Sequence, residues 1–363
     1  MKSVWINGKT YPIDPIVSGP ELIKTGKAFD DRVLQIIRDW IQGKMVFVFN
    51  TSGSTGEPHS IQIARAKMLH SARTTLKFLN LESGTCLLCL DPEFIAGTMM
   101  IIRALVGNMD LFVVTPSSNP LKEFPGDISV DLCAFVPLQV RKILNDRYSS
   151  RIFQNISNIL IGGADLPDSL ISKIGKFSNS VYHTFGMTET ATHIALQRLN
   201  GPSPDEYFQV VPGVAIQTDD RGCLVIKGEI TGNNPLVTND MVEIVDRSQF
   251  RWLGRIDHII NSGGIKVIVE SLEKNIGEIF FDEGIILPFF ISGIPDKKFG
   301  QRIAIIFESD PDQVDIKKIK AILKNKLKYY EIPKEWKALP AFLRTSTNKV
   351  NREKSLKKSK KIR

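Results

Sequence analysis

Four polar segments carry residue types that could bind and activate a phosphate ester. The first, residues 51–58, reads Thr-Ser-Gly-Ser-Thr-Gly-Glu-Pro and directly follows the apolar run 46–50. Glycines let backbone N–H groups wrap an anion, and the hydroxyls add further donors. Because the Gly-Lys-Ser/Thr ending of a Walker A loop is absent, a P-loop NTPase is disfavoured. The segment predicts a phosphate-binding loop, with a polar turn as the simpler alternative.

The second segment, 185–190, reads Phe-Gly-Met-Thr-Glu-Thr and follows another predicted strand. A carboxylate at the carboxyl edge of a parallel sheet, next to a phosphate loop from a neighbouring strand, is where Mg²⁺ bridging nucleotide phosphates would be held. Glu189 is therefore a candidate magnesium ligand. A solvated loop glutamate is the alternative.

The third segment joins Gly-Arg-Ile-Asp at 254–257 to Ser-Gly-Gly-Ile-Lys at 262–266. Arg and Asp there could bind a ribose and bracket a hinge, and paired glycines let a thin ligand pass close to the backbone. An ordinary hairpin turn is the alternative. The fourth segment, 344–352, holds Lys349 in a polar loop. This lysine could stabilise charge developing between a carboxylate and a phosphate, or it is one surface lysine among many.

The elements that must position these segments follow an α/β rhythm from about residue 44. Short apolar runs predict strands at 45–50, 86–90, 111–115, 130–135, 158–161 and 180–184. Amphipathic stretches predict helices at 64–80, 97–107, 138–145 and 166–175. This alternation predicts an α/β fold with a largely parallel sheet.

The pattern changes twice further along the chain. From about residue 202, short alternating runs with Gly/Asp turns predict a small antiparallel region. From about residue 258, strands and helices predict a compact α+β unit. We therefore divide the chain into an N-terminal domain (1–254), a hinge (255–258) and a small mobile C-terminal domain with a basic tail (259–363).

The formal charge of +8 is concentrated at one end of the 363-residue chain. Residues 334–363 contain eleven Lys or Arg and two Asp or Glu, a net +9, so the remainder is nearly neutral. Such a tail could touch phosphate or an anionic membrane, but no aromatic residues interleave with the terminal lysines. We expect a frayed, solvated tail and no nucleic-acid partner.

The N-terminus has no signal-peptide pattern, and no apolar stretch reaches the length of a membrane span. This predicts a cytoplasmic protein without integral membrane association. Four cysteines are too few for a disulfide scaffold. Cys86 and Cys89 fall in an apolar run, so we expect them to be buried rather than to bind metal.

In this order and spacing, the four segments resemble the motifs of the adenylate-forming superfamily of acyl-CoA synthetases, luciferases and peptide-synthetase adenylation domains. The resemblance covers about residues 44–352. It implies ATP and coenzyme A as substrates and Mg²⁺ as cofactor. It assigns the binding of ATP or AMP to Thr51, Ser52, Gly53, Ser54, Thr55, Gly56, Gly162, Gly163, Ala164, Phe185, Gly186, Asp240 and Arg255.

The same resemblance implies three catalytic residues. Thr188 would contact the α-phosphate, Glu189 would hold Mg²⁺, and Lys349 would be the adenylation lysine on the mobile domain. Asp257 matches the hinge of the family, and Gly263–Gly264 match the path of the CoA pantetheine.

The chain also departs from the family pattern. His59 stands where the phosphate loop usually has Lys, so phosphate binding must depend more on backbone and hydroxyl donors. Asn239 and Asn348 replace glycines before the ribose aspartate and the adenylation lysine, and asparagine can adopt left-handed backbone angles. The phosphate loop begins only about fifty residues into the chain, so most of the N-terminal part of typical members is missing.

Within the superfamily, 185–190 and 262–264 resemble the o-succinylbenzoate-CoA ligases of menaquinone biosynthesis, particularly their short bacterial form. Arg103 lies six residues after Gly97, where such ligases place a basic residue near the acid. Arginine binds carboxylate in bidentate fashion, which suits a substrate whose other carboxylate reacts with ATP. We expect Arg103, Gly97 and His193 to serve the acid substrate, with purely structural roles as the alternative.

The expected activity is ligation of a small carboxylic acid to CoA through an acyl-adenylate, with release of AMP and pyrophosphate. An acyl-AMP ligase that loads a carrier protein and a catalytically silent nucleotide-binding regulator are the alternatives, with nucleic-acid binding third. The sequence leaves open the identity of the acid and whether the protein forms a homodimer.

Overall fold

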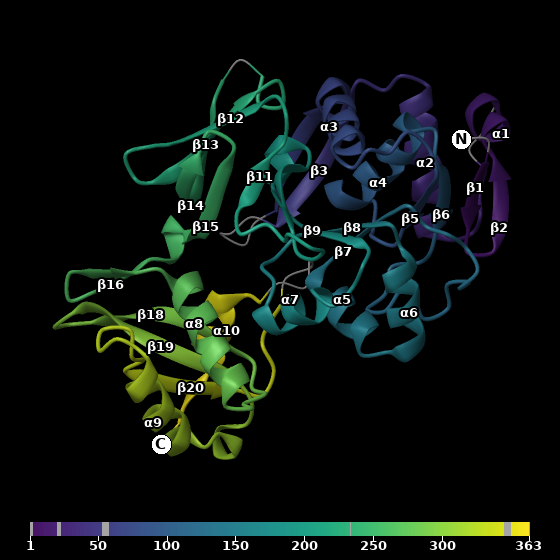
Figure 1. Cartoon of the computed structure of the whole chain (residues 1–363). Coiled ribbons are helices and arrows are strands. Elements are labelled where there is room, and N and C mark those ends of the chain that lie inside the picture. The colour runs from purple at the N-terminus through teal and green to yellow at the C-terminus, as the bar shows by residue number, and fades with distance from the viewer. Residues whose placement is uncertain (1–2, 20–22, 53–57, 233, 345–349, 363) are drawn as a thin grey trace.

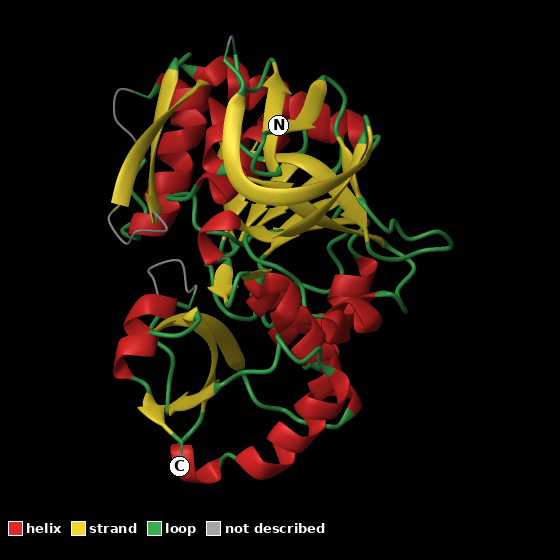
Figure 2. Ribbon diagram, turned by 90° about the vertical axis from the view of Figure 1, so that its left-hand side faces the viewer, coloured by secondary structure: helices red, strands yellow, loops and turns green. Residues whose placement is uncertain are grey.

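The computed structural model describes residues 3–19, 23–52, 58–232, 234–344 and 350–362. Within these residues the strands form a thirteen-stranded sheet, a six-stranded sheet and a two-stranded hairpin. The large sheet with its helices lies above the smaller one, and the two are seen stacked in Figures 1 and 2. The short helix η2 (Ile256–His258) lies on the connection from the last strand of the large sheet to the first strand of the smaller one.

The middle of the large sheet is parallel and buried on both faces. Its strands, in spatial order, are β9 (Ser180–Gly186), β8 (Asn158–Ile161), β7 (Leu132–Phe135), β5 (Thr85–Leu88), β6 (Asp110–Val113) and β1 (Ser3–Ile6), followed by the antiparallel edge strand β2 (Lys9–Pro12). Cys86 and Leu88 belong to the apolar core on one face, and Leu87 and Cys89 to the core on the other. Burial of both faces explains the continuous apolar run.

Helices cover both faces of this parallel region (Figure 1). One face carries α2 (Ala28–Ile41), α3 (Arg65–Phe78) and α4 (Ile95–Val106), with the short α1 (Ile13–Ser18) beside α2. The other carries α5 (Pro137–Leu144), α6 (Arg147–Asn155) and α7 (Asp168–Ile174). Helix α4 contacts α2, α3 and strands β5, β6 and β7, and its residues 97–104 are all buried. Arg103 is the charged exception on this central helix.

The predicted α/β class is confirmed, and the antiparallel region proves to continue the same sheet. The strands β10 and β9 pair antiparallel across a tight turn, which reverses the chain without a crossover. Beyond β9 the order is β10 (His193–Arg198), β11 (Phe208–Val210), β15 (Gln249–Arg255), β14 (Leu236–Asp246), β13 (Cys223–Gly228) and β12 (Val214–Thr218).

The strand before the predicted phosphate loop does not join the large sheet. Strand β3 (Val46–Ser52) pairs antiparallel with β4 (Pro58–Ala64), a strand that the sequence did not indicate, and the described residues show no other partner for either. The expectation that the loop follows a neighbour of the strand carrying Glu189 is therefore wrong. The loop, 53–57, lies outside the described residues, between the two strands of a hairpin.

The smaller sheet contains β17 (Ile265–Val267), β16 (Ile260–Ser262), β19 (Gly300–Glu308), β20 (Glu335–Leu339), β21 (Lys360–Lys361) and β18 (Phe289–Asp296), the last pairing with β19. Its helices are α8 (Val269–Asp282), α9 (Ile316–Lys326) and α10 (Arg352–Lys358), with the short helix η3 (Pro311–Gln313). The expected frayed tail is wrong: β21 pairs with β20, and Ile362 is buried in the core under the sheet. The tail is held because the apolar Ile362 side chain is buried, which the basic composition of the tail did not indicate.

Helix α8 connects the two sheets, because it packs against both α7 and β15. Near the middle of this helix, the Lys274 Nζ lies 3.6 Å from the Asp168 Oδ1 of α7. All four cysteines are buried and free, and the predicted burial of Cys86 and Cys89 is confirmed. Among the helices that the structure describes, none combines the length and apolar character needed to cross a membrane.

Candidate active site

The loop after β8 and the end of β9 meet at the carboxyl edge of the parallel strands. Gly162 must lack a side chain, because a Cβ there would lie 2.3 Å from the Thr184 Oγ1. Gly163 has a φ of +88°, which favours glycine. A ring nitrogen of His183 lies 3.3 Å from the Ala164 carbonyl oxygen. The structure thus places the predicted adenine-binding loop beside the strand that ends in the Phe-Gly motif.

The turn after β9 is rigid and presents the two predicted catalytic residues of this edge. The Thr190 hydroxyl lies 2.6 Å from the Thr192 carbonyl oxygen and 3.0 Å from that of Met187, which ties the turn together. This turn contains the short helix η1 (Thr188–Thr190), in which Thr188 is half-buried and Glu189 is exposed. A hydroxyl and a free carboxylate therefore stand side by side at the sheet edge.

Two neighbours complete this edge. The ring of Phe185 packs 5.2 Å from Phe250 and 5.7 Å from Phe208, between centroids. A Cβ on Gly186 would lie 2.3 Å from the Thr192 carbonyl oxygen, so the β9–β10 turn closes tightly only with glycine there. Strand β4 of the hairpin contacts η1. The hairpin that holds the predicted phosphate loop therefore lies next to the turn of Thr188 and Glu189.

On β14 and β15, two predicted ribose-binding residues face each other. The Asp240 carboxylate accepts a hydrogen bond from the Trp252 Nε1 at 3.0 Å, and its other oxygen lies 3.7 Å from the Arg255 Nη1. Burial raises the pKa of Asp240, although Trp252 and Arg255 oppose that rise. The pair offers one held carboxylate and one cation, which suits hydrogen bonding to vicinal hydroxyls and phosphate.

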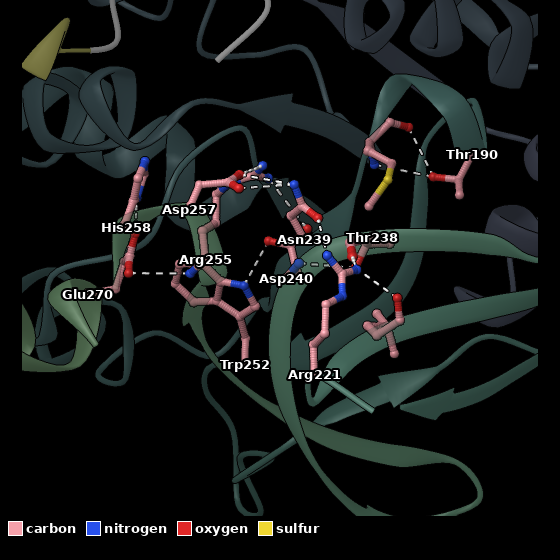
Figure 3. A network of polar contacts seen from close by, with 12 residues as sticks. Thr190, Arg221, Thr238, Asn239, Asp240, Trp252, Arg255, Asp257, His258 and Glu270 are labelled. Atoms are coloured by element: carbon pink, nitrogen blue, oxygen red, sulfur yellow. Dashed lines mark hydrogen bonds and ion pairs between the residues drawn. The ribbon is translucent and has the colours of Figure 1, made fainter. Parts of the chain in front are cut away.

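The predicted hinge residue belongs to the same network (Figure 3). The Arg255 Nη2 donates to the Asp257 carboxylate at 2.7 Å, and the Asn239 Nδ2 lies 3.1 and 3.2 Å from its two oxygens. The Arg221 Nη1 in turn donates to the Asn239 Oδ1 at 3.2 Å. Partial burial raises the pKa of Asp257, but the hydrogen bonds from Arg255 and Asn239 outweigh it and lower the pKa.

Helix α8 closes the network from the side of the smaller sheet. Its Glu270 accepts from the His258 ring and, at 3.3 Å, from the Arg255 backbone N–H. A Cβ on Gly254 would lie 2.5 Å from the Glu270 Oε2. Burial raises the pKa of Glu270, but the His258 contact outweighs it and lowers the pKa. The first residues after β15 are therefore held by groups from both sheets.

Arg103 is buried below the Thr-Glu turn. Its side chain is 2% exposed, its Nη2 donates to the Thr192 Oγ1 at 2.8 Å, and its Nη1 lies 3.5 Å from the Met100 Sδ. Its Nε has no hydrogen-bond partner, and no carboxylate pairs with it within the described ranges. Burial lowers the pKa of Arg103 to about 10, so the guanidinium stays charged at neutral pH. It is a buried cation with unused donors.

His193 joins Arg103 indirectly, through Thr192. Its Nδ1 lies 3.2 Å from the Thr192 Oγ1, and its Nε2 lies 3.1 Å from the Thr75 Oγ1 on α3. Gly97 has a packing role in this fold, since a Cβ there would lie 2.5 Å from the Asp91 carbonyl oxygen. That close approach seats the first turn of α4, the helix that carries Arg103.

The remaining predicted residues lie away from these contacts or outside the described ranges. Gly263 and Gly264 form the two-residue turn of the β16–β17 hairpin, with φ of +62° and +84°, and a Cβ on Gly264 would meet nothing within 4 Å. The side chains of Thr51, Ser52 and His59, and all of 53–57, are outside the description. Lys349 also lies outside it.

Sequence reasoning missed several residues of the site because their partners are distant along the chain. Arg221 reaches Asn239 across 18 residues, and Thr75 reaches His193 across 118. His258 and Glu270 belong to no recognisable spacing. Asn239 could have been found from the sequence, because it stands where the family has glycine. Its side-chain amide contacts Asp257, so the asparagine does more than permit the backbone angles of glycine.

A metal at this edge would depend on Glu189 and the nucleotide. No three His, Cys, Asp or Glu side chains gather as metal ligands in the part of the chain that the structure describes. Mg²⁺ in nucleotide enzymes is commonly held by one or two carboxylates together with phosphates and waters. The exposed Glu189 carboxylate fits that mode of binding.

A hairpin in contact with a Thr-Glu turn, and an Asp-Arg pair on the same large sheet, suit a nucleotide-binding enzyme. The chain belongs to the AMP-binding enzyme family, whose model matches residues 14–238. The resemblance drawn from the four motifs is thereby confirmed.

Known relatives agree with this placement. The chain is 35% identical to the acyl-CoA synthetase (AMP-forming)/AMP-acid ligase II-like protein from Dyadobacter fermentans, covering 92% of this chain and 95% of that one with a TM-score of 0.61. It is 27% identical over 332 residues to the 2-succinylbenzoate–CoA ligase of Staphylococcus epidermidis, covering 84% of this chain and 68% of that protein. The o-succinylbenzoate coenzyme A synthetase of Bacillus subtilis, solved with ATP and magnesium ion, shares the fold at a TM-score of 0.70 and 19% identity, covering 85% and 69%.

Proposed function

We propose that this protein is an AMP-forming ligase that joins a dicarboxylic acid, o-succinylbenzoate, to coenzyme A through an acyl-adenylate, in menaquinone biosynthesis. One observation carries the proposal: Arg103 is buried without a carboxylate partner among the described residues, and Thr192 joins it to the turn that contains Thr188 and Glu189. A site with a nucleotide edge and a buried cation suits an acid with two carboxylates, one to react and one to be held. Two of the three relatives described above are named for this activity.

In the first half-reaction, one carboxylate of the acid attacks the α-phosphate of ATP and pyrophosphate leaves. Bound Mg²⁺ would neutralise phosphate charge as pyrophosphate forms. The Thr188 hydroxyl lies at the sheet edge as a donor to the α-phosphate, and Asp240 and Arg255 hold the ribose. The protein contributes position and charge rather than a covalent step.

In the second half-reaction, the CoA thiol displaces AMP from the acyl-adenylate. We propose that the smaller sheet and its helices form a domain that rotates about residues 255–258. The support is that η2 lies on the connection between the two sheets, where Asn239 of β14 contacts Asp257 and Glu270 of α8 contacts His258. The rotation would withdraw Lys349 and bring the Gly263–Gly264 turn to the pantetheine.

The activity is tested by incubating the protein with MgATP, CoA and a panel of acids that includes o-succinylbenzoate and monocarboxylate analogues. We expect one dicarboxylate to give a thioester that mass spectrometry identifies, with AMP and pyrophosphate in equal amounts. Formation of an acyl-adenylate without any CoA thioester would instead favour loading of a carrier protein. Absence of both products with every acid would refute the ligase.

The two-step assignment is tested separately with Lys349→Ala. Because Lys349 acts only on the charge developing in the first step, this variant should lose acyl-adenylate formation by about a thousandfold or more, in the range of removing a preorganised charge-stabilising donor. Thioester formation from a supplied acyl-adenylate should stay within about twofold of wild type. Equal loss in both half-reactions would remove Lys349 from the adenylation step.

A further inference from the structure

A continuous chain of hydrogen bonds links Arg103 to helix α3 through the protein interior. It runs from the guanidinium through Thr192 and His193 to Thr75, with heavy-atom separations of 2.8, 3.2 and 3.1 Å. Arg103, His193 and Thr75 are 2%, 6% and 1% exposed. Because Thr75 and His193 are buried, their hydrogen-bonding groups are expected to find partners within the protein.

The hydrogen bond from Thr75 to Ser71 favours one direction for the bonds in this chain of hydrogen bonds. At one end, the Thr75 hydroxyl donates to the Ser71 carbonyl oxygen of the preceding helical turn at 2.9 Å. Its only proton is thereby used, so Thr75 accepts from the His193 Nε2–H. At the other end, Arg103 can only donate, so the Thr192 hydroxyl oxygen accepts from it.

The protonation state of His193 follows from these two ends. Burial, and then the charge of Arg103, hold the pKa of His193 well below its ordinary value, so the ring is neutral. A neutral ring with its proton on Nε2 has a bare Nδ1, which accepts the Thr192 hydroxyl proton. With this one tautomer, the hydroxyls of Thr75 and Thr192 and both ring nitrogens of His193 have partners.

We propose that His193, as the Nε2–H tautomer, is a positioning residue that holds the Thr192 hydroxyl as an acceptor for Arg103 and so orients the guanidinium toward the second carboxylate of the acid. The proposal rests on the ligase function proposed above and concerns its selectivity for dicarboxylic acids. His193 makes no contact with the substrate in this role.

The consequence for recognition is geometric. The hydrogen bond from one Nη2 proton to Thr192 restrains the guanidinium plane, and the Nε, which has no partner among the described residues, is available to an anion. Bidentate carboxylate binding requires two parallel N–H donors in one plane. A guanidinium free to turn would bind the same carboxylate more weakly and would discriminate less against monocarboxylates.

The test compares variants that break the chain of hydrogen bonds with variants that keep it. Thr75→Val and His193→Leu remove a link, whereas Thr75→Ser keeps the hydroxyl and His193→Gln keeps one donor and one acceptor. Loss of a buried neutral hydrogen bond of this kind corresponds to about a tenfold effect. Thr75→Val and His193→Leu should therefore raise the KM for o-succinylbenzoate about tenfold, with kcat and the KM for a monocarboxylate analogue within about twofold.

The conservative pair supplies the control for packing. Thr75→Ser and His193→Gln should keep the KM for o-succinylbenzoate within about threefold of wild type. A role limited to packing predicts instead that the KM values for both acids, or kcat alone, change together. That pattern, or no change in the ratio of the two KM values, overturns the positioning role.

A measurement without turnover tests the tautomer itself. In ¹⁵N-labelled protein at pH 7, the His193 signals, assigned by their absence in His193→Gln, should show a protonated Nε2 and a bare Nδ1. A protonated Nδ1 or a doubly protonated ring would overturn the proposal. If Arg103→Met alters dicarboxylate selectivity but His193→Leu and Thr75→Val do not, the ligase function stands and the positioning role falls. If wild type acts on no dicarboxylate, both fall.

Discussion

Arg103 and Arg255 lie in opposite electrostatic surroundings at the candidate active site. Arg255, with a third of its side chain exposed, lies 3.7 Å from the Asp240 carboxylate and 2.7 Å from that of Asp257. Arg103 is buried and contacts a hydroxyl and a sulfur atom, with no carboxylate beside it among the described residues. Carboxylates of the protein therefore neutralise Arg255, whereas none of the described carboxylates neutralises Arg103.

The difference indicates what each arginine is for. A buried charge without a counter-ion is costly, and a fold retains it where a ligand brings the opposite charge. Under the proposed function, the acid substrate supplies the charge opposite to Arg103. The charge of Arg255 is already shared between two carboxylates, so under the same proposal it fixes their geometry around the ribose and the proposed hinge.

The largest test of this contrast is Arg103→Met, a change of similar length beside Met100. The KM for o-succinylbenzoate should rise about a hundredfold, because charge-assisted hydrogen bonds to a buried carboxylate are lost. The midpoint of thermal unfolding should be equal to or higher than that of wild type, because an uncompensated buried charge has been removed. A lower midpoint together with unchanged KM would make Arg103 a structural residue.

Arg255→Met should show the opposite pattern. Asp240 and Asp257 lose their shared cation, so we expect a lower midpoint of thermal unfolding and a KM for ATP raised about tenfold. The ratio of KM values for the dicarboxylate and a monocarboxylate analogue should stay at the wild-type level. A change in that ratio would mean that the two arginines are not independent.

The neutral state of His193 makes stability depend on pH. Its pKa in the folded protein lies well below the ordinary value of about 6.5, so the unfolded chain takes up a proton that the folded chain refuses. The free energy of unfolding should therefore fall as pH drops below about 6.5, by up to about 1.4 kcal/mol per pH unit for this group. Urea denaturation of wild type and His193→Gln between pH 7 and 5 measures it. Parallel curves for the two proteins would show that His193 titrates normally.

The sequence predicted those parts of the site that are local in the chain. The Thr188–Glu189 turn follows its strand directly, and the φ and close contacts of Gly162 and Gly163 follow from residue type. The central strands were predicted because burial on both faces leaves uninterrupted apolar runs, as at Cys86–Leu90. Fold class and family could be inferred from such local signals.

Distant pairs could not be predicted in the same way. Strand β4 was missed because Ser60 and Gln62 place polar residues on its exposed face, so its apolar positions do not form a run. The anchoring of the tail depends on Ile362 and on the pairing of β21 with β20, both among charged neighbours. The Arg103–Thr192–His193 chain joins residues 89 positions apart. No spacing rule reports such contacts, because they arise from the packing of α3 and α4 against the β9–β10 turn.

The smallest expected effect comes from substituting Asn239, which contacts Asp257 beside Arg255. Its amide donates to both oxygens of Asp257 from a position where the family has glycine, so this chain holds the hinge carboxylate with one extra group. The contact is exposed, so Asn239→Ala should change the rate of thioester formation from a supplied acyl-adenylate only about twofold, upward, because the hinge is released. The isosteric Asn239→Asp sets a second carboxylate against Asp257 and should exceed that effect. If both variants match wild type in single-turnover rates, then Arg255 and Glu270 alone hold the hinge, and the network around Asp257 does not limit its motion.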